Sequence, residues 1–216
     1  MSLFAPLLPR EVRVAEQWGP LPDRDARFRA GRRLARDLIG APGATMPRGH
    51  RGAPVWPDGV VGSITHTQEY AAVAVASSRA VDSSHAVASS HAVDSIGIDA
   101  EPIAALPPET VAVVSNPQEI GSLDPVAAGA GALLSFVAKE AVFKAWWPLH
   151  ERELDFAEVD LAPVGDGRLV AHHPEGEWPV RWRAAEGMLL AAVVVTSGVR
   201  AERAARGSAT TRRRVR

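Results

Sequence analysis

Residues 96–101, Ile-Gly-Ile-Asp-Ala-Glu, combine a short apolar strand with two carboxylates. Successive side chains of a strand point to opposite faces, so Asp99 and Glu101 project to one side, about 6.6 Å apart along the backbone. Paired carboxylates at a strand end form an oxygen site suited to Mg²⁺, which also takes substrate phosphates and waters. Gly97 lets a neighbouring backbone or ligand approach closely. The alternative is a solvated, acidic strand end, and this segment alone does not decide between the two.

A helix is predicted over residues 124–147, where a second group of charged side chains lies. An Asp-Pro pair is typical of its start, and Pro148 predicts its end. One face at helical spacing would hold Leu133, Phe136, Val137, Glu140, Lys144 and Trp147. Glu140 and Lys144 are then neighbours, four residues apart.

Without a function, Glu140 and Lys144 would form a surface ion pair that stabilises the helix by about 0.3 kcal/mol. Two observations favour a function instead. The pair lies on an apolar face, where charge is costly, and Lys139 and Lys144 are the only lysines beside 22 arginines. Three carboxylates and two lysines fit phosphoryl-type transfer, in which a metal bridges phosphate oxygens and a carboxylate activates the nucleophile.

Residues 62–67, Gly-Ser-Ile-Thr-His-Thr, end a predicted strand with small hydroxyl side chains and a histidine. Hydroxyls, backbone amides and imidazole are good ligands of phosphate. A single histidine in such a place is also often purely structural, so this segment supports the transfer chemistry without proving it.

The order of these segments resembles one family. Residues 96–101 and the later Phe-x-x-Lys-Glu-Ala-x-x-Lys at 136–144 are similar to the signature pair of the Sfp-type 4′-phosphopantetheinyl transferases. Residues 51–57 and 62–66 resemble two upstream motifs of that family. The similarity looks greatest to its actinobacterial, enterobactin-synthase-component-like branch, where Lys-Ala-Trp-x-Pro-Leu also follows the last motif.

The resemblance implies an α+β fold made of a pseudo-twofold pair of similar halves, with the active site in the cleft between them. The reaction would transfer the 4′-phosphopantetheine arm of coenzyme A to a serine of apo acyl or peptidyl carrier proteins. It would release adenosine 3′,5′-bisphosphate. Mg²⁺ would be required, with Mn²⁺ a possible substitute, and coenzyme A would be the co-substrate.

The resemblance also implies roles for individual residues. Asp99, Glu101 and Glu140 would hold Mg²⁺ on the diphosphate, and Glu140 would take the serine proton, directly or through water. Lys144 would neutralise the diphosphate, and Lys139 would stabilise or protonate the leaving group. The expected coenzyme A contacts are Arg24, Arg32, Arg48, Arg51, Thr65, His66, Asp99, Lys139 and Lys144.

Some features depart from the family pattern. Many relatives have Gly-Lys-Pro where this chain has Gly-Ala-Pro at residues 52–54, so a lysine that contacts phosphate is absent there. Relatives often have Ser or Cys near His66, where this chain has threonines. The six-residue repeat of residues 80–95 and the arginine-rich end are also outside the pattern.

The domain organisation follows from the alternation of periodic segments. A helix is expected at 23–40, strands at 60–66, 70–77 and 95–100, and further strands at 154–161, 169–173, 178–184 and 188–196. A proline-rich segment at 103–123 would join an N-terminal α+β half, 1–102, to a C-terminal half, 103–197. Residues 198–216, with seven arginines and one glutamate, would form a basic, disordered tail.

Composition narrows the class of protein. The chain has no cysteine, which excludes a disulfide-stapled secreted module and favours the cytoplasm. No signal peptide or membrane-spanning run is expected. Outside the basic tail the net charge is negative, which disfavours nucleic acid as a partner. A monomer is expected from the family resemblance.

Two other functions stay open at this stage. A non-catalytic module that binds coenzyme A or carrier proteins would be expected to lack one of the charged residues of the set, and none is missing. A metal-dependent phosphohydrolase would usually need a second cluster of histidines and acids, and the remaining histidines show no such spacing.

Overall fold

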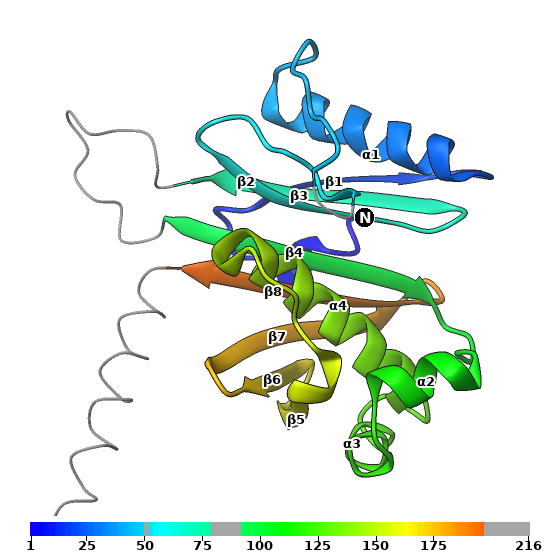
Figure 1. The fold of residues 1–216 in the computed structure, drawn as a ribbon. Helices are drawn as coiled ribbons and strands as arrows, with labels where there is room; N and C mark the ends of the chain where they lie inside the picture. Colours follow the sequence, from blue (N-terminus) through cyan, green and yellow to red (C-terminus); the bar gives the residue numbers. More distant parts are fainter. Residues whose placement is uncertain (50–51, 79–91, 197–216) are drawn as a thin grey trace, which may run out of the picture.

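The first half of the protein is built on a three-stranded antiparallel sheet in the order β1-β3-β2. The computed structural model describes residues 1–49, 52–78 and 92–196 (Figure 1). The elements of this half are η1 (Ala5–Leu7), β1 (Arg13–Trp18), α1 (Arg24–Ile39), β2 (Val60–His66) and β3 (Tyr70–Ser77). The helix α1 lies across one face of this sheet, so the central strand β3 is buried along nearly all of its length.

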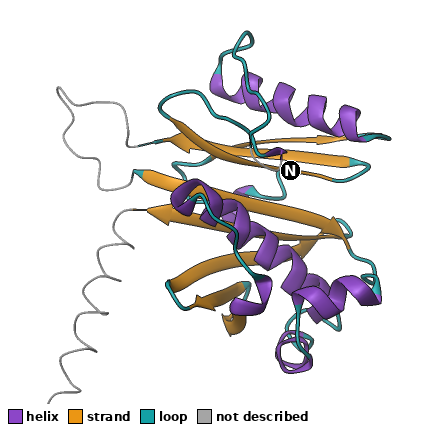
Figure 2. Ribbon diagram, in the orientation of Figure 1, coloured by secondary structure: helices purple, strands orange, loops and turns teal. Residues whose placement is uncertain are grey.

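The second half is a five-stranded antiparallel sheet in the order β4-β8-β7-β6-β5. Its strands are β4 (Val93–Pro102), β5 (Asp160–Gly165), β6 (Arg168–His173), β7 (Gly176–Ala185) and β8 (Met188–Thr196). Its helices are α2 (Pro108–Val114), α3 (Pro117–Leu123), α4 (Gly131–His150) and the short η3 (Phe156–Glu158). Figure 2 shows α4 lying along this sheet, which gives the second half the same helix-on-sheet plan as the first.

A shared apolar core holds the two sheets together. Tyr70, Ala72 and Ala74 on one face of β3 pack with Ile96 and Ile98 of β4 in a single buried cluster, which also takes in side chains of η1 and β8. The opposite face of β3 packs under α1. The two halves therefore form one folded unit, and the α+β class expected from the sequence is confirmed.

The clearest sequence signals match the structure. The predicted helix at 23–40 is α1, capped by Asp23, whose side chain accepts from the amide of Ala26, and ended by Gly40 in the left-handed conformation. The predicted strands at 60–66, 70–77 and 188–196 coincide with β2, β3 and β8.

Other boundaries were predicted wrongly. Residues 103–123, expected to be an irregular connection, contain α2 and α3, which at seven residues each are too short to display a helical period. The predicted helix at 124–147 begins at Gly131, whose amide donates to the side chain of Asp124. It also continues through Pro148 to His150, so the proline lies in the last turn of the helix instead of ending it.

The boundary between the halves also differs from the expected residue 102. Strand β4 is hydrogen-bonded along its length to β8, so it belongs to the second sheet. The first strand, β1, was not predicted, and the strand expected at 154–161 is divided between η3 and β5. The repeat at 80–95 and the tail at 198–216 lie mostly or wholly outside the described residues. None of the helices in the described part of the chain is both long and apolar enough to cross a bilayer.

The packing of α4 on β4 can be tested at Gly97. A β-carbon there would overlap the carbonyl oxygen of Ala141 and lie 2.7 Å from the amide nitrogen of Ala145. Both are backbone atoms of the helix, so α4 would have to move away. We expect Gly97→Ala to lower the free energy of unfolding by about 3 kcal/mol or more, the upper part of the range for overpacking, measured by urea denaturation.

Gly121→Ala in α3 is the matched control for this experiment. No atom lies within 4 Å of the added β-carbon at that position, and alanine is favoured over glycine in a helix by about 1 kcal/mol. The control should therefore be as stable as the parent protein or slightly more stable. Parent-like stability of Gly97→Ala would contradict the close contact between α4 and β4.

Candidate active site

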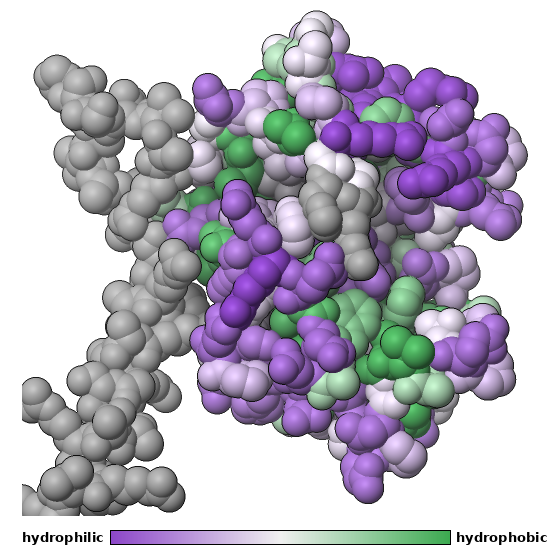
Figure 3. Space-filling model, viewed as in Figure 1, coloured by the Kyte–Doolittle hydropathy of each residue, from purple (hydrophilic) through white to green (hydrophobic). Residues whose placement is uncertain are grey.

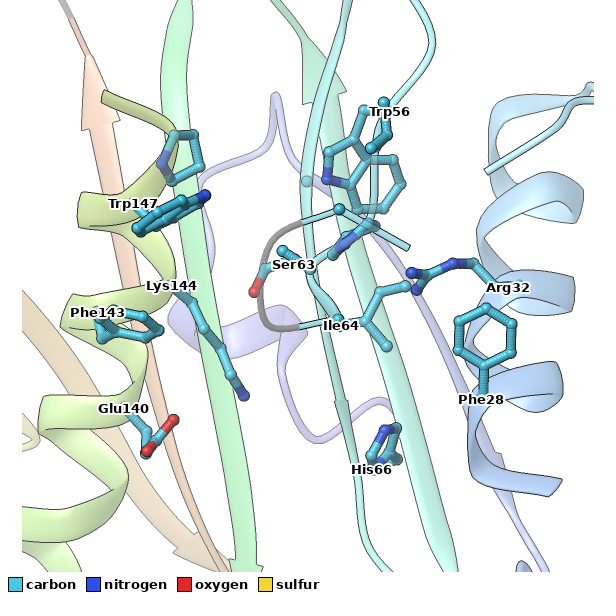
Figure 4. A pocket seen from close by; sticks show the side chains of 17 residues that line it. Phe28, Arg32, Trp56, Ser63, Ile64, His66, Glu140, Phe143, Lys144 and Trp147 are labelled. Atoms are coloured by element: carbon cyan, nitrogen blue, oxygen red, sulfur yellow. The ribbon is translucent and has the colours of Figure 1, made fainter. Parts of the chain in front are cut away.

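A cleft with a cavity volume of about 470 Å³ lies between the two halves. Figure 4 shows its two walls: Phe28 and Arg32 extend from α1 on one side, and Glu140, Phe143, Lys144 and Trp147 extend from α4 on the other. Between the walls, β2 presents Ser63, Ile64 and His66. A molecule in this cleft would contact both halves of the protein at once.

The strongest polar contact of the cleft joins α4 to β4. The Lys144 ammonium lies 2.6 Å from Oδ1 of Asp99 and 3.2 Å from the carbonyl oxygen of Ile98. Burial alone would lower the pKa of Lys144, but Asp99, Glu140 and Glu101 around it raise the pKa above its ordinary value. Lys144 is therefore a fixed positive charge at neutral pH.

Three carboxylates lie near this single lysine. Burial, together with the charge of Asp99, raises the pKa of Glu101 to about 7 against the opposing effect of Lys144. Burial also raises the pKa of Glu140, with Lys144 lowering it and Asp99 raising it. These mutual effects place Asp99, Glu101 and Glu140 in one electrostatic group, with an excess of negative charge when all three are ionised.

The carboxylate oxygens of this group are suitable ligands for a hard divalent cation. One oxygen of Asp99, Oδ2, is buried and has no hydrogen-bond partner in the part of the chain that the structure describes, and such an acceptor is costly unless a cation satisfies it. Among the described residues, no three His, Cys, Asp or Glu side chains are placed to hold a metal on their own. Mg²⁺ needs no such cage, because one or two carboxylates, substrate phosphates and waters usually complete its octahedron.

Two arginines lie on the α1 side of the cleft: Arg32, which is on the helix and lines the cleft, and Arg48, which comes from the loop after it and is not a lining residue. The guanidinium of Arg32 donates from Nε to the carbonyl oxygen of Met46, 3.1 Å away, while its Nη2 is buried and lacks a partner among the described residues. The guanidinium groups of Arg32 and Arg48 lie 4.6 Å and 4.0 Å from the ring centre of Phe28. Burial and Arg48 lower the pKa of Arg32 to about 10, so it stays charged at neutral pH. An anion is the natural ligand for this wall.

The other residues expected to contact the nucleotide of coenzyme A differ in whether they line the cleft. His66 lines the cleft, and its pKa is lowered, chiefly by partial desolvation. Thr65 is buried and points to Asp99 instead. Arg24 is exposed at the start of α1 and does not line the cleft. Arg51 lies outside the described residues.

Lys139 is directed away from the cleft. Its ammonium is enclosed in the second half, 3.1 Å from a carboxylate oxygen of Glu119, and donates to the carbonyl oxygens of Val114 and Phe156 at 2.7 Å and 3.0 Å. The expected contact of Lys139 with the leaving group is therefore not what the structure displays. Residues 139 and 144 are five apart, which places them about 140° apart around a helix of 3.6 residues per turn. Helical spacing alone thus separates the two lysines.

The aromatic walls of the cleft were not predicted as site residues. Phe143 and Trp147, with ring centres 6.4 Å apart, stand on the same side of α4 as Glu140 and Lys144. Phe28 precedes Arg32 by one helical turn, and Trp56 faces Gly62, where any β-carbon would collide with the indole. The helical spacing of Phe28, Phe143 and Trp147 from the charged site residues could have predicted their place in the cleft. The position of Trp56 could not be predicted in this way, because it depends on the path of a loop.

Comparison with known proteins agrees with this geometry. Residues 19–76, which contain α1, β2 and nearly all of β3, match the family model described as the 4′-phosphopantetheinyl transferase N-terminal domain. Residues 95–194, which contain the carboxylates and α4, match the model of the 4′-phosphopantetheinyl transferase superfamily. The two matches therefore fall on the two sides of the cleft.

Three curated proteins are similar over most of their length. The chain is 40% identical over 196 residues to the 4′-phosphopantetheinyl transferase Svp of Streptomyces mobaraensis, covering 82% of this chain and 74% of that protein. It is 37% identical to Npt of Nocardia iowensis, covering 74% and 76%, and 33% identical to PptT of Mycobacterium tuberculosis, covering 76% and 74%. With both halves matched and this level of identity, the chain belongs to the 4′-phosphopantetheinyl transferase superfamily.

Proposed function

We propose that this protein transfers the 4′-phosphopantetheine arm of coenzyme A to a serine hydroxyl of apo acyl or peptidyl carrier proteins, releasing adenosine 3′,5′-bisphosphate. The family membership and the names of its three relatives support the reaction. The observation that carries the proposal is the cleft, where arginine on one wall faces the carboxylate and ammonium of Glu140 and Lys144 on the other.

Coenzyme A, which donates the phosphopantetheine arm, would lie across the cleft. The unpartnered Nη2 of Arg32, with Arg48 beside it, supports binding of a nucleotide phosphate at the α1 wall. The rings of Phe28 and Trp56 offer apolar surface beside these charges. His66 would bind from β2, and the diphosphate would reach Lys144. We assign weaker, peripheral contacts to Arg24 because of its exposed position, and Arg51 stays a prediction from the motif alone.

The carboxylates would hold Mg²⁺, or Mn²⁺ in its place. Oδ2 of Asp99 is the best supported ligand, with Glu101 and Glu140 as further ligands or partners of bound water. The bound ion would neutralise the diphosphate and make its phosphorus more electrophilic. Lys144 would contribute a second positive charge, because the surrounding carboxylates keep it protonated.

Glu140 is the proposed base. Burial raises its pKa, which brings the carboxylate closer to the range in which a side chain can both take and return a proton near neutral pH. The serine hydroxyl of the carrier protein would lose its proton to Glu140, directly or through one water, as its oxygen attacks the β-phosphorus of coenzyme A. The bond from that phosphorus to the oxygen of the nucleotide would break, leaving adenosine 3′,5′-bisphosphate.

A second cavity, of about 290 Å³, supports an acceptor side. It shares Glu140 and Phe143 with the main cleft and is otherwise lined by α2, η3 and the chain before η3, including Val113, Leu154 and Phe156. Figure 3 shows apolar residues gathered over the region of α2 and α4, below the hydrophilic surface of α1. We propose that the carrier serine approaches Glu140 from this side. The ion pair of Lys139 with Glu119 would keep the backbone around this cavity in place.

Two further properties belong to the proposal. Both walls of the cleft come from one chain, so a monomer would suffice for catalysis. The cysteine-free sequence and the soluble nature of carrier proteins favour the cytoplasm as the place of action.

The proposed base predicts the effect of Glu140→Gln. The amide keeps the size of the side chain but can accept no proton, so we expect transfer to fall by about a hundred- to ten-thousandfold. The measurement is the mass gained by an apo carrier protein incubated with coenzyme A and Mg²⁺. Glu177→Gln, an exposed carboxylate on β7 of the far sheet, is the control and should retain full activity. Near-normal transfer by Glu140→Gln would remove this residue from the mechanism.

The proposed metal site predicts a pH-dependent affinity for Mg²⁺. Because the pKa of Glu101 is raised to about 7, lowering the pH from about 8 to about 6 protonates this carboxylate and removes a source of attraction for the cation. Calorimetric titration of the protein with MgCl₂ should therefore show binding weakening over that range. Glu101→Gln should bind Mg²⁺ at least about tenfold more weakly and with a shallower dependence on pH. Unchanged affinity would exclude Glu101 from the site.

A further inference from the structure

The two sheets are joined at their adjacent edges by side chains rather than by a backbone ladder. Strands β2 and β4 belong to different sheets, yet the amide of Ile98 donates to Oγ of Ser63 at 3.0 Å. The amide of Ala100 donates to Oγ1 of Thr65 at 3.2 Å. Residues 63 and 65 are two apart on β2 and so point to the same side. Both are buried, so these hydroxyls satisfy amides that water does not reach.

Thr65 makes one contact that Ser63 does not. Its hydroxyl donates to Oδ1 of Asp99 at 3.0 Å. A hydroxyl carries a single proton and two lone pairs. Since the amide of Ala100 occupies an acceptor position, the remaining proton can be directed at the carboxylate. Oδ1 of Asp99 thus receives two donors, the hydroxyl of Thr65 and the ammonium of Lys144.

The other oxygen of Asp99 is left without a donor. Oδ2 is buried and unpartnered among the described residues, while Oδ1 is held from the β2 side by Thr65 and from the α4 side by Lys144. Because Oδ1 accepts two hydrogen bonds, the carboxylate of Asp99 cannot rotate freely about its Cβ–Cγ bond. The group therefore presents Oδ2, rather than either oxygen at random, to a ligand.

We propose that Thr65 is a positioning residue, which fixes the carboxylate of Asp99 so that Oδ2 is available to a divalent cation. Through its hydrogen bond to Oδ1, it also ties the Asp99 carboxylate to strand β2, which carries the next residue, His66, into the cleft. The hydroxyl of Thr65 would then set the distance between the cation and the part of coenzyme A that the first half of the protein binds. This role replaces the direct contact with coenzyme A expected from the sequence. The use of the cation in transfer rests on the proposed function, but its binding can be measured without the reaction.

The comparison of Thr65 with Ser63 separates positioning from structural support. Thr65→Val removes the donor to Asp99 and the acceptor for Ala100 at nearly constant volume. Ser63→Ala removes only an acceptor for a β4 amide, the structural part of the same arrangement. Thr65→Ser keeps the hydroxyl and should restore what Thr65→Val loses.

The test is calorimetric titration of each full-length variant with MgCl₂ in the absence of coenzyme A, together with its thermal unfolding without metal. We expect Thr65→Val to bind Mg²⁺ about ten- to a hundredfold more weakly, the range found for groups that orient metal ligands. Thr65→Ser should stay within about threefold of the parent protein, a difference below 1 kcal/mol. Ser63→Ala should keep the parent affinity even where its unfolding temperature falls as far as that of Thr65→Val. Should Thr65→Val fail to fold, Thr65→Ala takes its place.

Two results would overturn the proposal. Parent-like Mg²⁺ affinity in Thr65→Val would show that the hydroxyl does not position Asp99, and an equal loss in Ser63→Ala would show that only the junction between the sheets matters. Transfer assays at increasing Mg²⁺ add a second measurement, in which Thr65→Val should need correspondingly more metal for half-maximal rate. Absence of transfer by the parent protein with normal Mg²⁺ binding would contradict the proposed function and leave the role of Thr65 intact.

Discussion

The contact of α4 with the backbone of β4 at Gly97 is the constraint on which the site depends. No side chain separates the helix from the strand there, and Oγ of Ser95 donates to the carbonyl oxygen of Ala145 at 2.7 Å beside it. Because α4 packs so closely on β4, Lys144 can reach both the side chain of Asp99 and the backbone of Ile98. A helix lifted by even one methyl group would carry Glu140 and Lys144 away from the strand.

The second constraint is charge. Three carboxylates share one accessible ammonium, since the other lysine is sealed in its own ion pair with Glu119. Burial, reinforced by this imbalance, raises the pKa values of Glu101 and Glu140, and one oxygen of Asp99 has no hydrogen-bond partner among the described residues. Such a site is unfavourable for the isolated protein, and the cation and diphosphate of the proposed reaction would relieve it. Such a local loss of stability is typical of a functional site.

How far the sequence predicted this arrangement depends on the range of the interactions involved. Helix α1 and strands β2, β3 and β8 were predictable because local period and capping residues determine them. The convergence of Asp99 with Lys144 was expected only from the family resemblance of the two motifs, because their contact spans 45 residues of chain. Helices α2 and α3 were too short to show a period, and the burial of Lys139 depends on Glu119 across two elements. The joining of β2 to β4 by hydroxyls leaves no local signal at all.

The junction between the sheets has a consequence for how motion of the two halves could be observed. Amides of an antiparallel strand face its two neighbours alternately, and those of Ile98 and Ala100 face β2, where only side-chain hydroxyls accept them. Their exchange with deuterated water should follow separation of the halves, whereas amides that face β8 should follow unfolding of the larger sheet. The amides of these two alternate residues would thus report opening of the cleft, and nuclear magnetic resonance could follow them without an attached label.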